Sequence, residues 1–592
     1  GTNPLNPDTD GDWCPDGWEV SYGLDPLDDG RIVLNNGGVG DPDSDRLNNY
    51  EEYRFETSPI DGSDPITRYV DASASGGGDG TSWPSAWDTI EDGINWKRGT
   101  DAPAIVLVTS GIYYEYDLEL DGATYPNLEK LALMGSVPYQ RPVIDAEDQG
   151  RVFSLINITI GKLDSIAISG GSRNTNGAGI FLSGSSPTLS NLLIYDNSST
   201  GSGRGGAIYL TANSSPLIID STITDNRGYN DYGGIYVSSG EPDIANTILW
   251  YNGIDLRYAG ATTDTVTYSN IGNLEGGINI IGFAGNISEE PGFRHGYSYL
   301  YHLATFFGQT NPNINTGTSW AAMLLDYEGE GRWNYLSQPA TGGGIPGLNY
   351  YDIGADEYLD SDYNTLPDWW EIKYFGAIGQ NPNLDEEPDG LINYQEYYYL
   401  TDPLNTDTDF DGLTDSDEVT YWNTIHDADW PDNPDNPHRW DSDDNGDHVV
   451  NIIDWDSDWD ALSDGPEVHY YGTDPAAADT DGDGLEDGEE VDYWNNQHNL
   501  DFPSGAETAW NYDWDGNGTV NLLDPDSDGD RTPDGWEDDN FLDPADDGFY
   551  FLVNGAGGDP DGDRINNYLE YGFGTDPNLA DSAMAATAAK SL

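Results

Sequence analysis

Between residues 177 and 252 the chain alternates apolar and polar positions in short runs that are separated by turn residues. Three segments align: GAGIFLSGSSPTLSNLLIYDN, GGAIYLTANSSPLIIDSTITDN and GGIYVSSGEPDIANTILWYN, which start at Gly177, Gly205 and Gly233. Each has a strand-like run after its glycines, a Ser/Pro turn, a second run and then Asn. Alternation with period two predicts β-strands, and a repeat of about 28 residues with three short strands predicts one coil of a parallel β-helix.

Polar residues recur at the ends of these coils, one coil apart. Stacked coils would place them above one another in two ladders, which satisfy polar groups at inward turns. The first ladder comprises Asn197, Asn226 and Asn252, and the second comprises Asn191, Asp220 and Asn246.

Outside this region acidic residues recur with a different spacing. Residues 479–490 read DTDGDGLEDGEE, with Asp or Glu at places 1, 3, 5, 9 and 12. Carboxylates a few Å apart repel by about 1 kcal/mol per pair in water, so a folded loop with five of them requires a compensating cation. Side chains at places 1, 3 and 5, a carbonyl at place 7 and a bidentate carboxylate at place 12 match the oxygen shell of Ca²⁺, which Mg²⁺ fits poorly. The loop resembles an EF-hand calcium loop, with Gly484 at the sharp turn and Asp487 placed to bind through water.

The same template occurs in ten further loops, so we expect about eleven calcium sites. The additional loops are Asp8–Glu19, Asp41–Glu52, Asp360–Glu371, Asp385–Glu396, Asp407–Glu418, Asp443–Asp454, Asp456–Glu467, Asp513–Asp524, Asp526–Glu537 and Asp559–Glu570. The predicted ligands, with place 7 contributing its carbonyl, are Asp8, Asp10, Asp12, Cys14, Glu19, Asp41, Asp43, Asp45, Leu47, Glu52, Asp360, Asp362, Asn364, Leu366, Glu371, Asp385, Glu387, Asp389, Leu391, Glu396, Asp407, Asp409, Asp411, Leu413, Glu418, Asp443, Asn445, Asp447, Val449, Asp454, Asp456, Asp458, Asp460, Leu462, Glu467, Asp479, Asp481, Asp483, Leu485, Glu490, Asp513, Asp515, Asn517, Thr519, Asp524, Asp526, Asp528, Asp530, Thr532, Glu537, Asp559, Asp561, Asp563, Ile565 and Glu570. Only four loops keep Gly at place 6, and two end in Asp, which reaches less far than Glu.

The net charge of the chain restricts the classes of partner that it can bind. The 592 residues include 21 Lys and Arg against 108 Asp and Glu, a formal net charge of −87. Electrostatic binding of nucleic acid or an anionic membrane is therefore excluded, and we find no apolar run long enough to span a bilayer. Millimolar calcium is an extracellular condition, so we expect an extracellular or cell-surface protein. A single cysteine allows no internal disulfide, and calcium can take the stapling role instead. Because the chain starts at Gly1 without Met, we expect a processed or truncated start.

The acidic loops belong to internal repeats. PDGWEVSYGLDPLDDG at 15–30 recurs as PDGWEDDNFLDPADDG at 533–548, and NNYEEYRFETSP at 48–59 recurs as NNYLEYGFGTDP at 566–577. These modules resemble bacterial thrombospondin type 3 repeats, and the two loops that end in Asp resemble dockerin loops, which implies calcium-loaded, stalk-like modules. At the places where dockerins bind cohesins this chain has Ile452–Ile453 and Leu522–Leu523, which we expect to pack inside.

The middle of the chain carries a second resemblance. RYVDASASGGGDGTSWPSAWDTIEDGI at 68–94 is similar to the opening of right-handed parallel β-helix domains in bacterial surface proteins. NTILWYNG, TVTYSNI and DIGADEY, at 246–253, 265–271 and 352–358, are similar to their closing coils. The resemblance implies an N-terminal helical cap, with Trp83, Trp87 and Ile90 facing the first coil, and an irregular C-terminal cap over 288–350.

The expected fold class is mainly β, a right-handed parallel β-helix flanked by small calcium-binding EF-hand-like loop-helix modules. The expected domains are an N-terminal calcium module at 1–66, the β-helix with both caps at 67–358, an array of calcium modules at 359–583 and a tail at 584–592.

Two functions fit this organisation. Pectate lyases use the β-helix fold, but fold alone does not decide function. Near the coil turns stand Asp196, Asp225, Asp231, Arg173, Arg204 and Arg227, in no catalytic signature that we recognise. Our main expectation is a non-enzymatic, extracellular, calcium-stabilised structural protein, a subunit of a surface fibre, filament, surface layer or adhesive stalk, self-associating head to tail into a homopolymer and with a surface glycan as a further partner. The alternative is a polysaccharide lyase or glycan-binding protein that uses the β-helix groove.

Overall fold

The computed structural model describes most of the chain. The described residues are 2, 6–30, 33–38, 40–136, 141–259, 266–276, 285–289, 291, 312–313, 352–355, 360–362, 364–426, 442, 444–445, 449–497 and 510–580. They fall into two compact units, one built from residues 1–294, 301–363 and 367–373 and one from 295–300, 364–366 and 374–592. No helix within these ranges is long and apolar enough to cross a membrane. The predicted irregular cap over 288–350 lies almost wholly outside the described residues.

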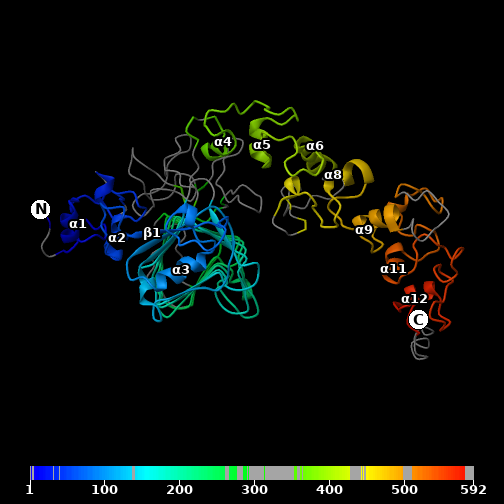
Figure 1. The fold of residues 1–592 in the computed structure, drawn as a ribbon, viewed down its shortest axis with the longest axis horizontal. Coiled ribbons are helices and arrows are strands. Elements are labelled where there is room, and N and C mark those ends of the chain that lie inside the picture. The colour runs from blue at the N-terminus through cyan, green and yellow to red at the C-terminus, as the bar shows by residue number, and fades with distance from the viewer. Residues whose placement is uncertain are drawn as a thin grey trace. The chain divides into compact units, whose positions relative to one another are not determined.

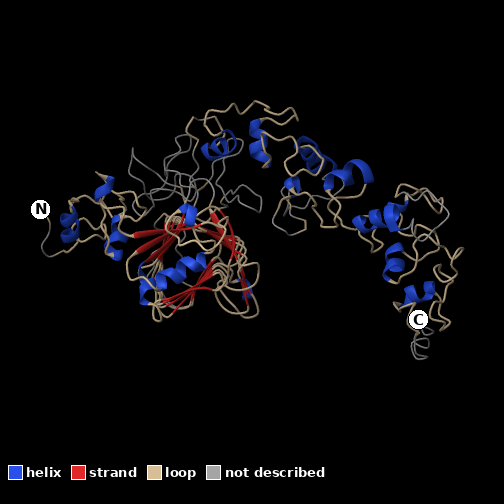
Figure 2. Ribbon diagram, viewed as in Figure 1, coloured by secondary structure: helices blue, strands red, loops and turns tan. Residues whose placement is uncertain are grey.

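The middle domain is a parallel β-helix, as the repeats predict (Figures 1 and 2). Sheet A runs in the order β1 (Ile66–Val70), β2 (Ala104–Val108), β5 (Leu131–Gly135), β8 (Lys162–Asp164), β12 (Thr188–Ser190), β16 (Leu217–Ile219), β20 (Asp243–Ala245) and β23 (Val266–Thr267). Sheet B runs β3 (Gly111–Tyr114), β6 (Pro142–Asp145), β9 (Ala167–Ser169), β13 (Leu193–Ile194), β17 (Thr222–Thr224), β21 (Ile248–Trp250) and β24 (Asn270–Ile271). Sheet C runs β4 (Leu118–Asp121), β7 (Phe153–Ile156), β11 (Ile180–Ser183), β15 (Ile208–Thr211), β19 (Ile235–Val237), β22 (Leu256–Tyr258) and β25 (Leu274–Glu275). A small fourth sheet joins β10 (Ser172–Arg173), β14 (Ser198–Ser199) and β18 (Arg227–Gly228).

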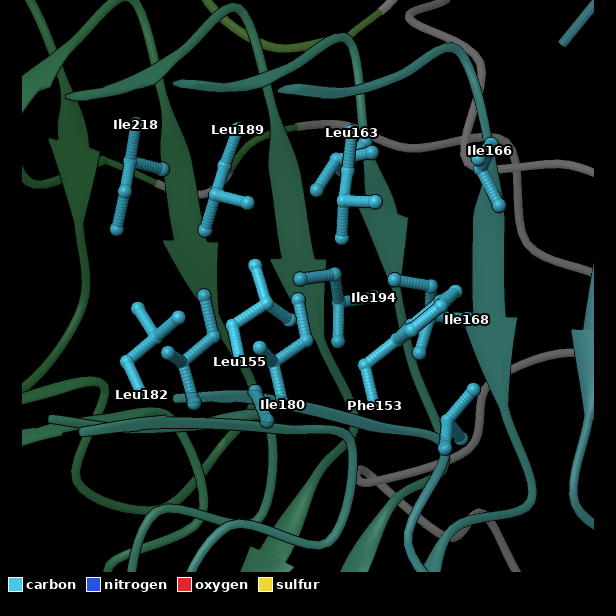
Figure 3. Close-up of a cluster of buried hydrophobic side chains, with 14 of the residues drawn as sticks. Phe153, Leu155, Leu163, Ile166, Ile168, Ile180, Leu182, Leu189, Ile194 and Ile218 are labelled. Atoms are coloured by element: carbon cyan, nitrogen blue, oxygen red, sulfur yellow. The ribbon is translucent and has the colours of Figure 1, made fainter. Parts of the chain in front are cut away.

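The core of the β-helix consists of aliphatic side chains stacked in register. Because strand side chains alternate between faces, every second residue of each strand points inward. Ile180 pairs with Ile208, and Ile208 pairs with Ile235, so equivalent residues of successive coils lie above one another. Figure 3 shows the rows that meet inside, with Leu163, Leu189 and Ile218 facing Leu155 and Leu182; all are buried.

The first predicted polar ladder is confirmed, and of the second the link between Asp220 and Asn246 is present. The backbone N–H of Asn197 donates to Asn226 Oδ1 at 3.0 Å, and that of Asn226 donates to Asn252 Oδ1 at 3.1 Å. In the second ladder Asn246 Nδ2 donates to Asp220 Oδ1 at 3.0 Å. These buried side chains satisfy the backbone groups that each turn leaves outside the sheets.

The N-terminal cap is confirmed except for one residue. Helix α3 (Ile90–Arg98) starts after Thr89, whose hydroxyl accepts from the Asp92 N–H, and Ile90 and Ile94 are buried in the core of the β-helix together with Trp87. Trp83 does not face the first coil. It is 39 % exposed and lies at the side of Tyr69, with the ring centroids 4.6 Å apart, because the short helix η2 (Trp83–Ser85) turns it outward.

The modules outside the β-helix contain short helices that begin at place 9 of an acidic loop. They are α1 (Asp16–Tyr22), α2 (Asn49–Phe55), α4 (Asp368–Phe375), α5 (Asn393–Tyr399), α6 (Asp415–Thr420), α8 (Asp464–Pro466), α9 (Asp487–Asp492), α11 (Asp534–Asp539) and α12 (Asn567–Phe573). Short helices of other types in these modules are η1 (Leu34–Asn36), η5 (Tyr421–His426), η7 (Asn451–Ile453), η8 (Glu467–Tyr471), η9 (Tyr493–Gln497) and η10 (Asn521–Leu523), and the β-helix itself contains η3 (Pro126–Lys130) and η4 (Tyr229–Asp231). Helices this short are unstable alone in water, so packing and capping must hold them.

Ile452 and Leu522 are buried, as expected for residues that pack inside, whereas Ile453 and Leu523 remain partly exposed.

Candidate functional sites

The acidic loops share one backbone shape. In loop 479–490 the residues at places 4 and 6, Gly482 and Gly484, have φ of 81° and 103°. Six described loops have another residue at place 6, and these too are left-handed, with φ between 74° and 89°: Trp13, Arg46, Thr365, Ala461, Arg531 and Arg564. A left-handed residue other than Gly costs roughly 1–2 kcal/mol. The loops therefore make the same bend without Gly, at a cost that the rest of the loop offsets.

Within an acidic loop, some carboxylate oxygens accept backbone N–H groups of the loop, and others point to the middle of the loop. Asp479 accepts the Gly482 N–H at 2.8 Å and the Gly484 N–H at 2.9 Å, and Asp483 Oδ1 accepts the Leu485 N–H at 2.8 Å. The second oxygen of Asp481 is buried and has no hydrogen-bond partner among the described residues.

The ligand atoms also converge. In several loops three acidic side chains place ligand atoms within 4.8 Å of one another: Asp8, Asp10 and Asp12; Asp41, Asp43 and Asp45; Glu387, Asp389 and Glu396; Asp407, Asp409 and Asp411; Asp456, Asp458 and Asp460.

The glutamates at place 12 are the most unusual groups in the loops. Glu19 and Glu490 are completely buried, and neither carboxylate has a hydrogen-bond partner in the described part of the chain. Burial, reinforced by the neighbouring aspartates, raises the pKa of Glu19 to about 8 and that of Glu490 to about 11. A buried ionised carboxylate without a partner is strongly unfavourable. An oxygen-seeking cation of high coordination number would fit the donor set of these loops.

The aspartate at place 9 has a structural role that the sequence did not reveal. Both oxygens of Asp487 are used by Thr480 at place 2: the N–H donates at 3.0 Å and the hydroxyl at 2.6 Å. The same brace joins Asp16 to Thr9, Asp368 to Ser361, Asp415 to Thr408 and Asp464 to Ser457. Place 9 therefore ties the start of the helix to the start of the loop, rather than serving mainly as a ligand through water.

Loops of neighbouring modules are joined through the aspartate at place 5. Asp460 Oδ2 accepts the N–H of Gly488 at 2.9 Å, and Asp483 Oδ2 accepts the N–H of Gly535 at 2.8 Å. Both glycines stand at place 10 of a later loop, Gly488 in loop 479–490 and Gly535 in loop 526–537. A Cβ on Gly535 would lie 2.5 Å from the carbonyl carbon of Gly484, so the contact between the two loops requires a residue without a side chain.

Two predicted sites are altered or incompletely described. Asp443 and Asp447 lie outside the described residues. In the loops that end in Asp, an asparagine side chain donates to place 12: Asn445 Nδ2 to Asp454 Oδ2 at 2.9 Å, and Asn517 Nδ2 to Asp524 Oδ2 at 2.8 Å.

The charged residues near the coil turns have separate partners. Arg173 pairs with Asp117, Arg204 Nη1 donates to the Tyr236 hydroxyl at 2.9 Å, and the Thr224 hydroxyl donates to Asp225.

Sheet C carries an outward row that sequence reasoning missed. Phe181, Tyr209, Tyr236 and Arg257 are paired in register on successive strands. The ring centroids of Phe181 and Tyr209 are 5.9 Å apart and those of Tyr209 and Tyr236 are 5.5 Å apart, with interplanar angles of 3° and 9°. The signal was present in the aligned repeats, because an aromatic residue follows Ile in each of GIF, AIY and GIY.

Arginines flank this row. The guanidinium of Arg151 lies 4.6 Å from the centroid of Phe181, and that of Arg204 lies 5.3 Å from Tyr236 and 5.6 Å from Tyr232. Arg204 Nε is buried without a hydrogen-bond partner among the described residues. A guanidinium held over rings is a positioned donor for an anion.

Comparison with known proteins gives a fold and no family. No protein-family model and no curated protein matches the chain. Among solved structures, pectate lyase Pel9A matches 36 % of this chain at 11 % identity with a TM-score of 0.24. The pectin methylesterase from Aspergillus niger, in its deglycosylated form, matches 38 % at 18 % identity with a TM-score of 0.21. The match spans about three fifths of the pectate lyase, 61 % of its length, and 84 % of the methylesterase. The class of protein is defined by the fold itself: a parallel β-helix protein.

These matches correct our main functional expectation. The non-enzymatic subunit of a fibre or surface layer is contradicted, because the matched structures are named as a pectate lyase and a pectin methylesterase. The findings side with the alternative that the sequence left open, a polysaccharide lyase or glycan-binding protein. The physical reason for the error is that regular coils and calcium loops describe the scaffold and say nothing of what its faces bind.

Proposed function

We propose that this protein binds calcium in its acidic loops and works where free calcium is abundant, outside the cell. The observation that carries the proposal is the pair of buried carboxylates, Glu19 and Glu490, neither of which has a protein partner. Each stands at the place where an oxygen-only shell requires a bidentate ligand. The aspartates at places 1, 3 and 5 would complete the shell, and the cation would neutralise carboxylates that otherwise repel one another.

Calcium titration of the full chain by calorimetry tests this proposal. Glu490→Gln should lower the number of bound ions by one, whereas the adjacent, exposed Glu489→Gln should leave it unchanged. In chelator near neutral pH, Glu490→Gln should melt at a higher temperature than the unmodified protein, because it removes a carboxyl whose burial requires proton uptake on folding. Equal stoichiometry in the two variants would show that place 12 is not a ligand.

A second function, binding of an acidic polysaccharide on sheet C, is supported by the outward row of that sheet. Its rings are stacked on one another and Tyr236 is only 6 % exposed, so the row presents the edges of Phe181 and Tyr209 rather than free ring faces. Recognition would therefore depend on polar and charged groups, with the part-exposed guanidinium of Arg204, which Tyr236 holds through Nη1, offering positive charge to a sugar carboxylate. Coils follow one another at about 4.8 Å, so the row from Phe181 to Arg257 spans roughly 15 Å, enough for a short oligosaccharide.

Binding of a short oligogalacturonide, compared with a neutral xylan oligosaccharide at equal calcium, tests this second proposal. Arg204→Ala should weaken binding of the acidic oligosaccharide by about 10- to 100-fold, the effect of losing a hydrogen bond to a charged group. Arg227→Ala, an exposed arginine of β18 in the small fourth sheet, is the matched control and should have no effect. New reducing ends or unsaturated products, recorded in the same samples, would extend the proposal from binding to catalysis. Equal affinity for the acidic and neutral oligosaccharides would contradict it.

A further inference from the structure

The first and last modules of the chain are duplicates in different surroundings. Residues 15–59 align with 533–577 without a gap, so α2 and α12 are equivalent helices. Both begin after an asparagine cap that accepts the N–H three residues on, Glu51 in one and Leu569 in the other. Both end in a left-handed residue, Glu56 with φ of 58° and Gly574 with φ of 66°.

In the N-terminal module, one face of this helix and its loop packs against the β-helix. Leu47 and Phe55 form a buried cluster with Ile105, Ala132 and Met134. The latter three lie on the outer face of sheet A, where Ile105 pairs with Ala132 and Ala132 pairs with Lys162.

Ion pairs surround this cluster. Lys162 Nζ lies 2.8 Å from Glu51 Oε2, Arg46 Nη2 lies 3.0 Å from Asp164 Oδ2, and Lys130 Nζ lies 2.6 Å from Glu56 Oε2. The face thus combines an apolar centre with charged side chains, the acids Glu51 and Glu56 and the base Arg46, that pair with opposite charges on or next to sheet A.

In the C-terminal module, the same face is bare. Phe573 is 44 % exposed where its counterpart Phe55 is 1 % exposed, and Leu569 is 43 % exposed where Glu51 is 3 % exposed. The acidic residues are replaced as well: Leu569 stands in place of Glu51, and Gly574 in place of Glu56. The face therefore exposes two large apolar side chains on a chain of net charge −87, and exposed apolar surface of this kind marks interaction sites.

We propose that Ile565, Leu569 and Phe573 form a docking face for the outer sheet of a parallel β-helix in a different protein. The duplicate module shows what such a face packs against in this molecule: an aliphatic sheet row. The replacement of Glu51 by Leu569 predicts how the partner's sheet differs from sheet A of this chain. The partner must carry an apolar residue at the position that corresponds to Lys162.

A second copy of this chain fits less well. Its sheet A is already covered by its own N-terminal module, and Leu569 would leave the buried ammonium of Lys162 without the carboxylate that Glu51 supplies.

Transplanting the face within the full-length chain tests whether it can dock on a sheet. Residues 46–59 are replaced by the sequence of 564–577, with and without Lys162→Leu, and oxidation of Met134 by peroxide reports whether the row is covered. The replacement alone places Leu opposite Lys162, so docking should weaken and Met134 should be oxidised about tenfold faster or more. A tenfold change corresponds to a loss of ~1.4 kcal/mol of docking free energy. With Lys162→Leu, or with the transplanted Leu changed back to Glu, the rate should return to near that of the unmodified protein.

Three outcomes would overturn the proposal. The first is fast oxidation of Met134 in the variant that carries both the transplanted segment and Lys162→Leu, at the rate seen in Phe55→Asp, in which the module is undocked. The number of bound calcium ions must show at the same time that the transplanted loop is folded. The second is radical footprinting of the unmodified protein that finds Phe573 as protected as Phe55, which would mean that the chain fills the face itself. A dimer in sedimentation that Phe573→Asp abolishes would also overturn it, because the partner would then be a second copy.

Discussion

The N-terminal module and the β-helix are joined by two ion pairs that look alike in sequence but should differ greatly in free energy. The side chains of Lys162 and Glu51 are only 2 % and 4 % exposed, whereas those of Lys130 and Glu56 are 24 % and 79 % exposed. Both acids belong to α2 or its cap, and both bases lie on or next to sheet A.

The magnitudes follow from burial. Removing one partner of a buried pair leaves an uncompensated charge and costs about 3–5 kcal/mol, whereas an exposed pair contributes about 0–1 kcal/mol. Burial lowers the pKa of Lys162, but attraction by Glu51 and then Asp164 outweighs it and leaves the pKa above its ordinary value. Asp164 therefore remains as a second partner, so Glu51→Gln should fall near the lower limit, about 3 kcal/mol. Glu56→Gln should cost less than about 1 kcal/mol.

Urea unfolding in saturating calcium, followed by fluorescence, measures both values. The double variant Glu51→Met with Lys162→Met should recover most of the loss, because an apolar pair of similar volume removes both desolvation costs. Equal destabilisation by Glu51→Gln and Glu56→Gln would refute the reasoning, since it would mean that the module leaves sheet A before the β-helix unfolds.

Three further predictions concern other parts of the molecule. Without calcium, the pKa values of Glu19 and Glu490 are raised to about 8 and about 11, so the stability that these groups contribute is fully present below the ordinary glutamate pKa and is lost as pH rises through the raised values. The calcium-free modules should therefore melt at a lower temperature at pH 9 than at pH 5. Saturating calcium should reverse this order in calorimetry. Gly535→Ala should destabilise the C-terminal array by about 1–3 kcal/mol through overpacking against Gly484, whereas Ala at the equivalent Gly17, which has nothing within 4 Å, should be neutral or stabilising in chemical unfolding. Asn226→Leu removes a side chain that donates to the carbonyls of Ile194 and Thr224, and it should cost about 2–5 kcal/mol of β-helix stability. In thermal unfolding the transition of the β-helix should move to lower temperature by the same amount with and without chelator.

The sequence predicts structural features that recur along the chain and misses contacts that occur only once. The coils, the polar ladders and the loop shapes were foreseen because each recurs at fixed spacing, as Asn197, Asn226 and Asn252 illustrate. The aromatic row of sheet C repeats as well and could have been found from the same alignment. The contact of Leu47 and Phe55 with Met134 could not, because it joins distant segments once and leaves no periodic trace. Trp83 was misplaced because an exposed ring against Tyr69 and a buried ring on the first coil have the same pattern in sequence.

The links between loops connect metal binding in one module to the fold of the next. Asp460 uses Oδ1 to accept the N–H of Leu462 in its own loop and Oδ2 to accept the N–H of Gly488 at the start of α9. The first N–H groups of a helix have no partner inside it, so this carboxylate also serves as a cap. In the proposed calcium site, the cation at loop 456–467 would hold Asp460 in the orientation that caps α9. Loss of that ion frees the carboxylate and unpairs the next helix, even if the loop of that helix keeps its own ion. Calcium release should therefore spread from a damaged loop toward the C-terminus by one module, and less so in the opposite direction.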